Sequence, residues 1–145
     1  MERGERKVVV DASVAVKWFV EEEYTREALL LRESYLEGLV ELIAPCLLPY
    51  EVLNALKYSA AFGEDELKEI ASALESLQIR LYSLEGNYAA TTIEVAMRSG
   101  LTIYDASYIG LALVEKATLY TADEKLLKKA GSLGIAKHIR DYKVP

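Results

Sequence analysis

The segment "KVVVDASVAVKWF", residues 7–19, places a single carboxylate, Asp11, between two apolar runs. Its three consecutive valines are typical of a buried strand, and the small residues followed by Val16 and Phe19 indicate a helix that begins at once. Asp11 therefore lies where the strand ends. An ionised carboxylate there is costly unless something pairs with it, yet aspartate also caps helices well, so this segment alone leaves both interpretations open.

Length and composition predict one ordinary domain. The chain has 145 residues, of which 52% are hydrophobic, and no linker-like stretch divides it, so we expect a single domain over residues 1–145. No apolar stretch is long and uncharged enough to cross a bilayer, and the amino-terminal "MERGERKVVV" lacks the features of a signal peptide. The sequence therefore predicts a cytoplasmic protein.

The counts of cysteine and histidine exclude several classes of chemistry. The single cysteine, Cys46, lies in an apolar stretch and is predicted to be a buried small hydrophobe, and the single histidine, His138, is predicted at the surface. A histidine-rich zinc site or a Cys-His dyad cannot be built from these residues, and no Gly-x-Ser-x-Gly turn presents a serine nucleophile. The chemistry that remains is that of side-chain oxygen atoms.

The hydrophobic pattern alternates between strands and helices along nearly the whole chain. After the first strand and its helix, helices are predicted over residues 23–38, 49–63, 64–77, 87–100, 104–117 and 123–131, and strands over 40–44, 79–84, 118–121 and 134–139. In the second of these helices Pro49 suits the first turn and Gly63 suits the end. The alternation predicts an α/β fold with a central parallel sheet covered on both faces.

Four acidic residues fall at the places where such a sheet positions a ligand, beyond the carboxyl ends of its strands. Asp11 and Asp123 each follow a strand directly, Asp105 opens an apolar helix, and Glu51 lies in the first turn of another helix with Asn54 one step further on its face. Each acid taken singly could be a helix cap or a residue that favours a helix amino terminus. Four acids in this pattern indicate a shared site.

Polar neighbours of these acids favour a divalent cation. Ser13, Asn54 and Thr121 lie two or three residues from one of the acids and can orient a carboxylate or hold a bound water without adding charge. Clustered carboxylates repel each other unless a cation neutralises them, and an all-oxygen set favours Mg²⁺ or Mn²⁺ over zinc. Such an ion activates water and polarises a phosphodiester, as in metal-dependent nucleases.

Four segments resemble, in order, the signatures of the PIN domain, and in particular of the VapC-like toxin ribonucleases of bacterial and archaeal toxin–antitoxin pairs. They are "VVVDAS", "PYEVLNAL", "YDASYIGLA" and "LYTADEKLL". The resemblance extends from about Lys7 to the carboxyl end. It implies a three-layer α/β/α sandwich with a central parallel sheet, Mg²⁺ or Mn²⁺ as cofactor, RNA as substrate and a small antitoxin protein as partner.

The resemblance also implies roles for individual residues. Its catalytic and metal-binding acids correspond to Asp11, Glu51, Asp105 and Asp123, with Ser13, Asn54 and Thr121 as supporting positions around them. It further implies a homodimer, and residues 24–36 and 50–76 supply the most amphipathic helices for contacts with a second copy or with an antitoxin.

The net charge of −6 suits a polyanionic substrate poorly. The charge is uneven, however, because residues 116–145 contain seven Lys or Arg against three Asp or Glu. A basic rim beside Asp123, or alternatively a solvated helix face, is predicted from Lys125, Lys128, Lys129, Lys137, Arg140 and Lys143. Core or cleft-wall positions are predicted for Tyr50, Tyr104, Tyr108 and Tyr120.

Other functions compete with a toxin ribonuclease. A haloacid-dehalogenase-like phosphatase requires a second aspartate where this chain has Ser13, and an RNase-H-like fold begins with hairpin strands that this chain lacks. A housekeeping PIN-domain RNA-processing nuclease, and a catalytically weak PIN-like module that binds proteins, remain as alternatives. The presence of all four acids favours an enzyme.

Overall fold

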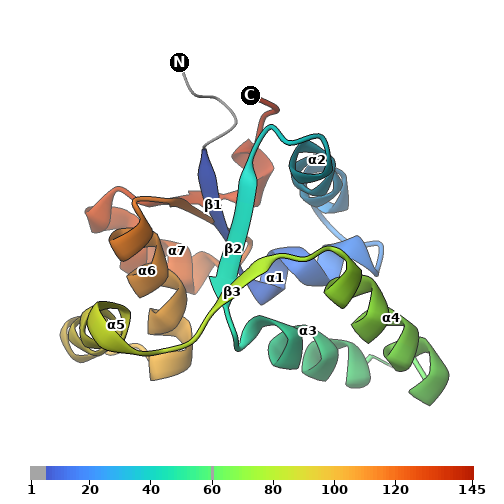
Figure 1. Cartoon of the computed structure of the whole chain (residues 1–145), viewed down its shortest axis with the longest axis horizontal. Helices are drawn as coiled ribbons and strands as arrows, with labels where there is room; N and C mark the ends of the chain where they lie inside the picture. Colours follow the sequence, from blue (N-terminus) through green and yellow to red (C-terminus); the bar gives the residue numbers. More distant parts are fainter. Residues whose placement is uncertain (1–5, 60) are drawn as a thin grey trace.

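A five-stranded sheet with all strands parallel forms the centre of the computed structural model, which describes residues 6–59 and 61–145 (Figure 1). The strands are β1 (Lys7–Val10), β2 (Glu41–Pro45), β3 (Arg80–Tyr82), β4 (Thr118–Thr121) and β5 (Ala136–His138). They follow the order β3-β2-β1-β4-β5 across the sheet, so β1 is central and the next strands along the chain extend from it in one direction before β4 and β5 are added on its other side. The predicted α/β class is confirmed.

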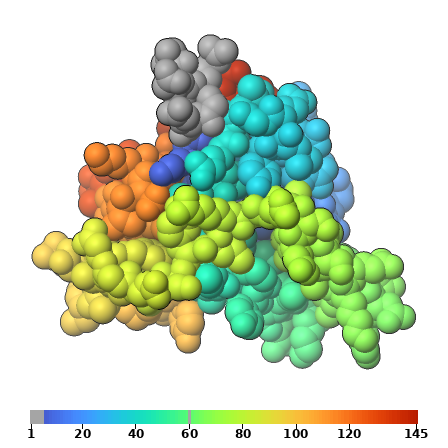
Figure 2. Space-filling model, in the orientation of Figure 1, coloured from blue at the N-terminus to red at the C-terminus, as the bar shows by residue number. Residues whose placement is uncertain are grey.

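Helices cover both sides of this sheet and complete the three layers. The helices are α1 (Ala12–Ala15), α2 (Thr25–Leu36), α3 (Leu48–Lys57), α4 (Glu64–Ser76), α5 (Gly86–Ser99), α6 (Ile103–Glu115) and α7 (Glu124–Ala130). In Figure 1, α1 to α4 lie on one side of the strands and α5 to α7 on the other. Figure 2 shows α4 and α5 at the two lower corners of the surface, with α3 between them. In the described part of the chain no helix combines the length and apolar character that crossing a bilayer requires.

The central position of β1 explains its valine run. Val8, Val9 and Val10 are fully buried, because β1 pairs with β2 on one side and β4 on the other while α6 packs against it. A strand buried on both faces needs apolar residues at successive positions rather than at alternate ones. The same strand then delivers Asp11 to its carboxyl end, directly before α1.

Close packing of α5 on α6 fixes the helix that contains Asp105. A Cβ atom on Gly110 of α6 would overlap the Thr92 hydroxyl of α5 and crowd the Thr92 backbone, so only glycine permits this approach. The Tyr88 hydroxyl of α5 also donates a hydrogen bond of 2.9 Å to the Ser107 carbonyl near the start of α6. These contacts, two and five residues beyond Asp105, hold α6 against α5.

The predicted helix over residues 49–63 is too long. Helix α3 ends at Lys57, and Gly63 instead precedes α4 as its N-cap with an extended backbone. The Gly63 N–H donates to the Glu66 carboxylate at 2.9 Å, which satisfies one of the free donors at this helix start. Glutamate three residues after Gly63 is therefore the local signal for a helix beginning, and it outweighs the tendency of glycine to end helices.

The predicted environments of Cys46 and His138 are both wrong. Cys46 is exposed because it follows Pro45 at the carboxyl end of β2, where the chain leaves the sheet. His138 is only 2% exposed: it ends β5, its ring contacts Tyr24 edge-on, and its Nδ1 accepts a hydrogen bond from the Arg140 N–H. Burial lowers the pKa of His138.

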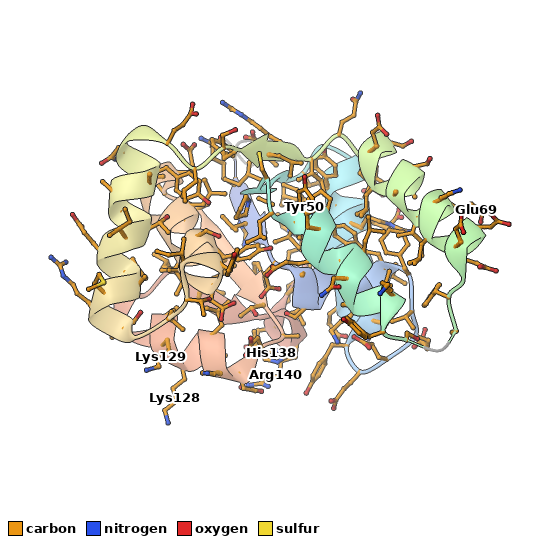
Figure 3. The ribbon with its side chains drawn as sticks, turned by 90° about the horizontal axis from the view of Figure 1, so that it is seen from below. Tyr50, Glu69, Lys128, Lys129, His138 and Arg140 are labelled. Atoms are coloured by element: carbon orange, nitrogen blue, oxygen red, sulfur yellow. The ribbon has the colours of Figure 1, made fainter. Side chains whose placement is uncertain are left out.

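The tyrosine prediction holds for three of the four residues. Tyr108 and Tyr120 are buried, and Tyr50, although 76% exposed, lines a groove between α3 and α4, whereas Tyr104 is 63% exposed. Tyr50 is labelled on α3 in Figure 3. Both exposed tyrosines lie in the first turns of helices at the carboxyl edge of the sheet, where no further layer covers them.

Candidate active site

All four predicted acids line one cavity of about 280 Å³ at the carboxyl edge of the sheet. Asp11 follows β1, Asp123 lies beyond β4, Glu51 comes from α3 and Asp105 from α6. Asn54, Ser13 and Tyr108 also line the cavity. Figure 3 looks at the molecule from below in Figure 1, the end toward which β2 runs. Segments far apart in the sequence are thus brought to one place.

Asp11 is the deepest of the four acids and is held by three hydrogen-bond donors. Its side chain is 4% exposed, and it accepts from the Ser13 hydroxyl at 2.7 Å, from the Thr121 hydroxyl and from the Val14 N–H. Burial nevertheless raises the pKa of Asp11 to about 6, because the loss of water outweighs these donors. Asp11 is therefore the N-cap of α1 and also an acid whose ionised form is disfavoured by burial.

Ser13 and Thr121 connect Asp11 to the segment that contains Asp123. The Ser13 oxygen accepts from the Ala122 N–H at 2.8 Å, and the Thr121 oxygen accepts from the Asp123 N–H at 2.9 Å. Each hydroxyl therefore accepts a hydrogen bond from a backbone N–H and donates one to Asp11. These bonds connect the end of β1 to the end of β4 and fix the direction of both Asp11 oxygens.

Asp123 and Asp105 lie nearer to solvent. Asp123 caps α7 by accepting from the Lys125 and Leu126 N–H groups, whereas Asp105 does not cap its helix, because Thr102 does. The pKa of Asp105 is raised, first by burial and then by the charge of Asp123, and the Lys125 ammonium opposes this rise. The Asp105 carboxylate therefore does not serve as a helix cap.

Glu51 has a partner that the sequence analysis did not single out for the site. The buried Tyr108 hydroxyl donates to the Glu51 carboxylate at 2.7 Å, and burial together with Glu51 raises the pKa of that tyrosine. Tyr108 lies three residues after Asp105 on α6, so the two share a helix face. This spacing of three residues from Asp105 was the sequence signal that could have identified Tyr108 as a site residue. Asn54 lines the cavity from the helix of Glu51, one step further along.

The donor set fits a hard divalent cation, although the side chains are not drawn together around one. In residues 6–59 and 61–145, no three His, Cys, Asp or Glu side chains come close enough to share a metal ion. The available donors are carboxylate and amide oxygens, which Mg²⁺ and Mn²⁺ prefer. The described residues also give buried Asp11 no Lys, Arg or His within ion-pair distance, so its charge is uncompensated by the protein.

Two larger grooves flank the cavity. The α3–α4 groove has a volume of about 700 Å³, is mostly apolar and shares Asn54 with the cavity. The α5–α7 groove has a volume of about 720 Å³ and begins at Lys125, two residues after Asp123. Neither groove contains the acids, so the small polar cavity remains the place for chemistry and the grooves are surfaces beside it.

Comparison with known proteins shows the family of the chain. Residues 8–132 match the PIN domain family. The chain is 32% identical over 134 residues to "Ribonuclease VapC3" of Pyrobaculum aerophilum, an alignment that covers 88% of this chain and 97% of the relative.

Solved structures share the fold. A crystal structure of a protein from Pyrobaculum aerophilum matches with a TM-score of 0.62 and 26% identity over 94% of this chain and 92% of that one. A toxin–antitoxin complex from Klebsiella pneumoniae matches with a TM-score of 0.65 and 16% identity, covering 94% of this chain and 99% of that chain. Mycobacterium tuberculosis VapC20, described as a Sarcin-Ricin loop cleaving toxin, matches with a TM-score of 0.67 and 14% identity over 88% and 95% of the two chains.

Proposed function

The chain belongs to the PIN domain family and is related along nearly its whole length to a VapC ribonuclease, and we propose that it is a metal-dependent endoribonuclease that hydrolyses RNA phosphodiester bonds. We further propose that it is the toxin of a toxin–antitoxin pair and acts in the cytoplasm, where RNA is available. Asp11, Glu51, Asp105 and Asp123 are its catalytic and metal-binding residues in this proposal, and Mg²⁺ or Mn²⁺ is its cofactor.

One observation carries the proposal: a buried carboxylate, Asp11, lies among three other acids with no cationic side chain in ion-pair distance among the described residues. Burying an uncompensated charge is costly, and neighbouring carboxylates increase that cost. Such a cluster also repels a phosphodiester. A bound cation neutralises the buried charge and also reduces the repulsion of the phosphodiester. Relief of the repulsion among the four carboxylates therefore favours binding of the cation.

The residues of the chain have distinct tasks in this mechanism. Ser13 and Thr121 fix the two oxygens of Asp11, and Tyr108 fixes Glu51. Asp105 and Asp123 lie nearer the open side of the cavity, where the RNA and the attacking water enter. When bound, a divalent ion supplies a polarised water and offsets the negative charge on the phosphate. Preset carboxylate directions reduce the reorganisation that the reaction requires.

The α3–α4 groove is the surface that we propose for the antitoxin. It is lined by apolar side chains that include Leu53, Phe62 and Leu67, and it opens next to Asn54 of the catalytic cavity. A peptide segment that fills it with apolar side chains would also obstruct the cavity. The structurally similar assembly from Klebsiella pneumoniae is described as a toxin–antitoxin complex, which supports a protein partner of this kind. We also propose that the protein forms a homodimer.

Cleavage of RNA by the purified protein tests the proposal. Wild-type protein should cleave a mixture of cellular RNAs with Mg²⁺ or Mn²⁺ and should not do so with a chelator. Asp123→Asn should lower the rate by about a hundredfold or more, because a misplaced cation removes several kcal/mol of transition-state stabilisation. Asp65→Asn, the same change in the first turn of α4 and outside the cavity, is the matched control. Cleavage that persists in chelator, or equal rates for both variants, would overturn the proposal.

A further inference from the structure

The α5–α7 groove contains a concentration of positive charge in an otherwise acidic protein. Its lining includes four cationic side chains, Arg98 from α5 and Lys125, Lys128 and Lys129 from α7, against the single acid Glu94. The whole chain has a formal charge of −6, so this local excess has the opposite sign to the average. Charge separated in this way attracts an anionic partner to one surface.

The four cations are available for a ligand. Within residues 6–59 and 61–145, none of them forms a salt bridge, and all four are exposed. Lys125, Lys128 and Lys129 are spaced by three and four residues, so they lie on one face of α7. Lys128 and Lys129 project from the edge of the molecule in Figure 3, on the side opposite Glu69 of α4.

The other basic residues near the carboxyl terminus do not belong to this surface. Arg140 donates to the Glu124 carboxylate at 3.0 Å, and its charge is therefore largely used within the protein. Lys137 and Lys143 are exposed but do not line the groove. The basic rim predicted from the sequence thus separates into the three α7 lysines, which face the groove with Arg98, and three residues that lie elsewhere.

The groove and the catalytic cavity are lined by consecutive residues of α7. Lys125 lines it two residues after Asp123, whose carboxylate accepts the Lys125 N–H at 2.9 Å. Leu126, the next residue, lines the catalytic cavity. The start of α7 thus separates the two hollows by a single residue step, close enough for neighbouring nucleotides of one RNA chain to reach both, and the apolar residues Val95, Leu113 and Leu133 of the groove offer contacts to bases or sugars.

We propose that the α5–α7 groove binds the sugar–phosphate backbone of single-stranded RNA adjacent to the scissile bond, through Arg98, Lys125, Lys128 and Lys129. This inference rests on the proposed ribonuclease function and adds to it the path of the substrate. It explains how an acidic protein holds a polyanion: the acids act on one phosphate with a cation present, while neighbouring phosphates contact a separate cationic surface. Contacts of this kind carry little sequence information, so the groove supplies affinity rather than sequence specificity.

Two matched double variants test the proposal. Lys128→Gln/Lys129→Gln removes two groove charges, and Lys137→Gln/Lys143→Gln removes the same total charge elsewhere. Binding of a labelled mixed-sequence 20-nucleotide RNA is measured by fluorescence anisotropy with Ca²⁺ in place of Mg²⁺, at several salt concentrations, with intact RNA verified on a gel. Each lost phosphate contact should weaken binding roughly fivefold at 0.1 M salt and reduce the logarithmic salt slope by about 0.7.

The groove variant should therefore bind RNA roughly 25-fold more weakly than wild type, while the control stays within about twofold. In cleavage assays its KM should rise while kcat is retained, because the acids are untouched. Equal weakening by both variants, or no weakening by the groove variant, would overturn the proposal while leaving the ribonuclease function intact. If wild type neither binds nor cleaves RNA, the function itself fails. If the groove variant retains RNA binding but loses self-association or an acidic protein partner, the groove is a protein interface.

Discussion

Asp11→Asn should stabilise the metal-free protein at neutral pH, although it removes a residue proposed for catalysis. Burial raises the pKa of Asp11 from 3.8 to about 6. The folded protein therefore keeps the proton of Asp11 to higher pH than the unfolded chain does, and its stability falls as the pH rises through about 6. This difference in pKa corresponds to about 3 kcal/mol of destabilisation once Asp11 is ionised, and asparagine avoids it.

Comparison across pH isolates this term from any change in packing. Below pH 4 the wild-type carboxyl is protonated and neutral, like asparagine, so the two proteins differ only in hydrogen bonding. Between pH 4 and pH 8 the free energy of unfolding of Asp11→Asn should gain on that of wild type by up to about 3 kcal/mol. Ionisation of Asp105 is common to both proteins and should cancel.

Urea unfolding of both proteins at pH 4, 6 and 8 in the presence of a chelator is the measurement. Repetition at pH 8 with Mg²⁺ is the control, since a bound cation should stabilise wild type and leave the variant almost unchanged. A difference in unfolding free energy that stays constant across pH would refute the argument, because Asp11 would then be an ordinary helix cap with a normal pKa.

Further variants and titrations test other parts of the site. Thr121→Val removes a donor to Asp11 and should lower the free energy of unfolding by about 1–3 kcal/mol in urea, whereas Thr121→Ser should retain most of it. Tyr108→Phe should cost about 1 kcal/mol and weaken metal binding, since Glu51 loses its donor; calorimetry with Mn²⁺ measures the latter, and unchanged affinity would contradict the role of this hydrogen bond. Wild-type affinity for Mn²⁺ should fall about tenfold from pH 7.5 to pH 5 as Asp11 protonates, and equal affinities would count against the acid cluster. Light scattering should report a dimer at micromolar concentration, and a monomer throughout would remove the homodimer proposal.

The order of elements and the convergence of the acids could be predicted because both depend on local signals. The valine run of β1 is readable as a doubly buried strand, and each acid lies at a strand end or in a first helical turn. Parallel strands bring such positions to one edge of the sheet. Four short segments and their order along the chain were therefore enough to predict that the acids converge.

Features that depend on contacts between distant segments could not be predicted in the same way. His138 is buried because Tyr24 packs on its ring, and Tyr108 belongs to the site because its hydroxyl meets Glu51 of another helix. The basic residues near the carboxyl end separate into groove-lining and other positions because three lysines lie on α7, whereas Lys137, Arg140 and Lys143 lie in later segments, and composition over a 30-residue stretch does not reveal this.

The anomalous scattering of Mn²⁺ in a crystal of the protein tests the central claim most directly. We expect a peak inside the cavity lined by Asp11, Glu51, Asp105 and Asp123 in wild-type protein, with the carboxylates drawn toward the ion, and no peak in Asp11→Asn grown and soaked in the same way. An ion bound elsewhere, or a cavity that stays without Mn²⁺ at saturating concentration while the protein still cleaves RNA, would contradict the assignment of these four acids as the metal-binding catalytic site.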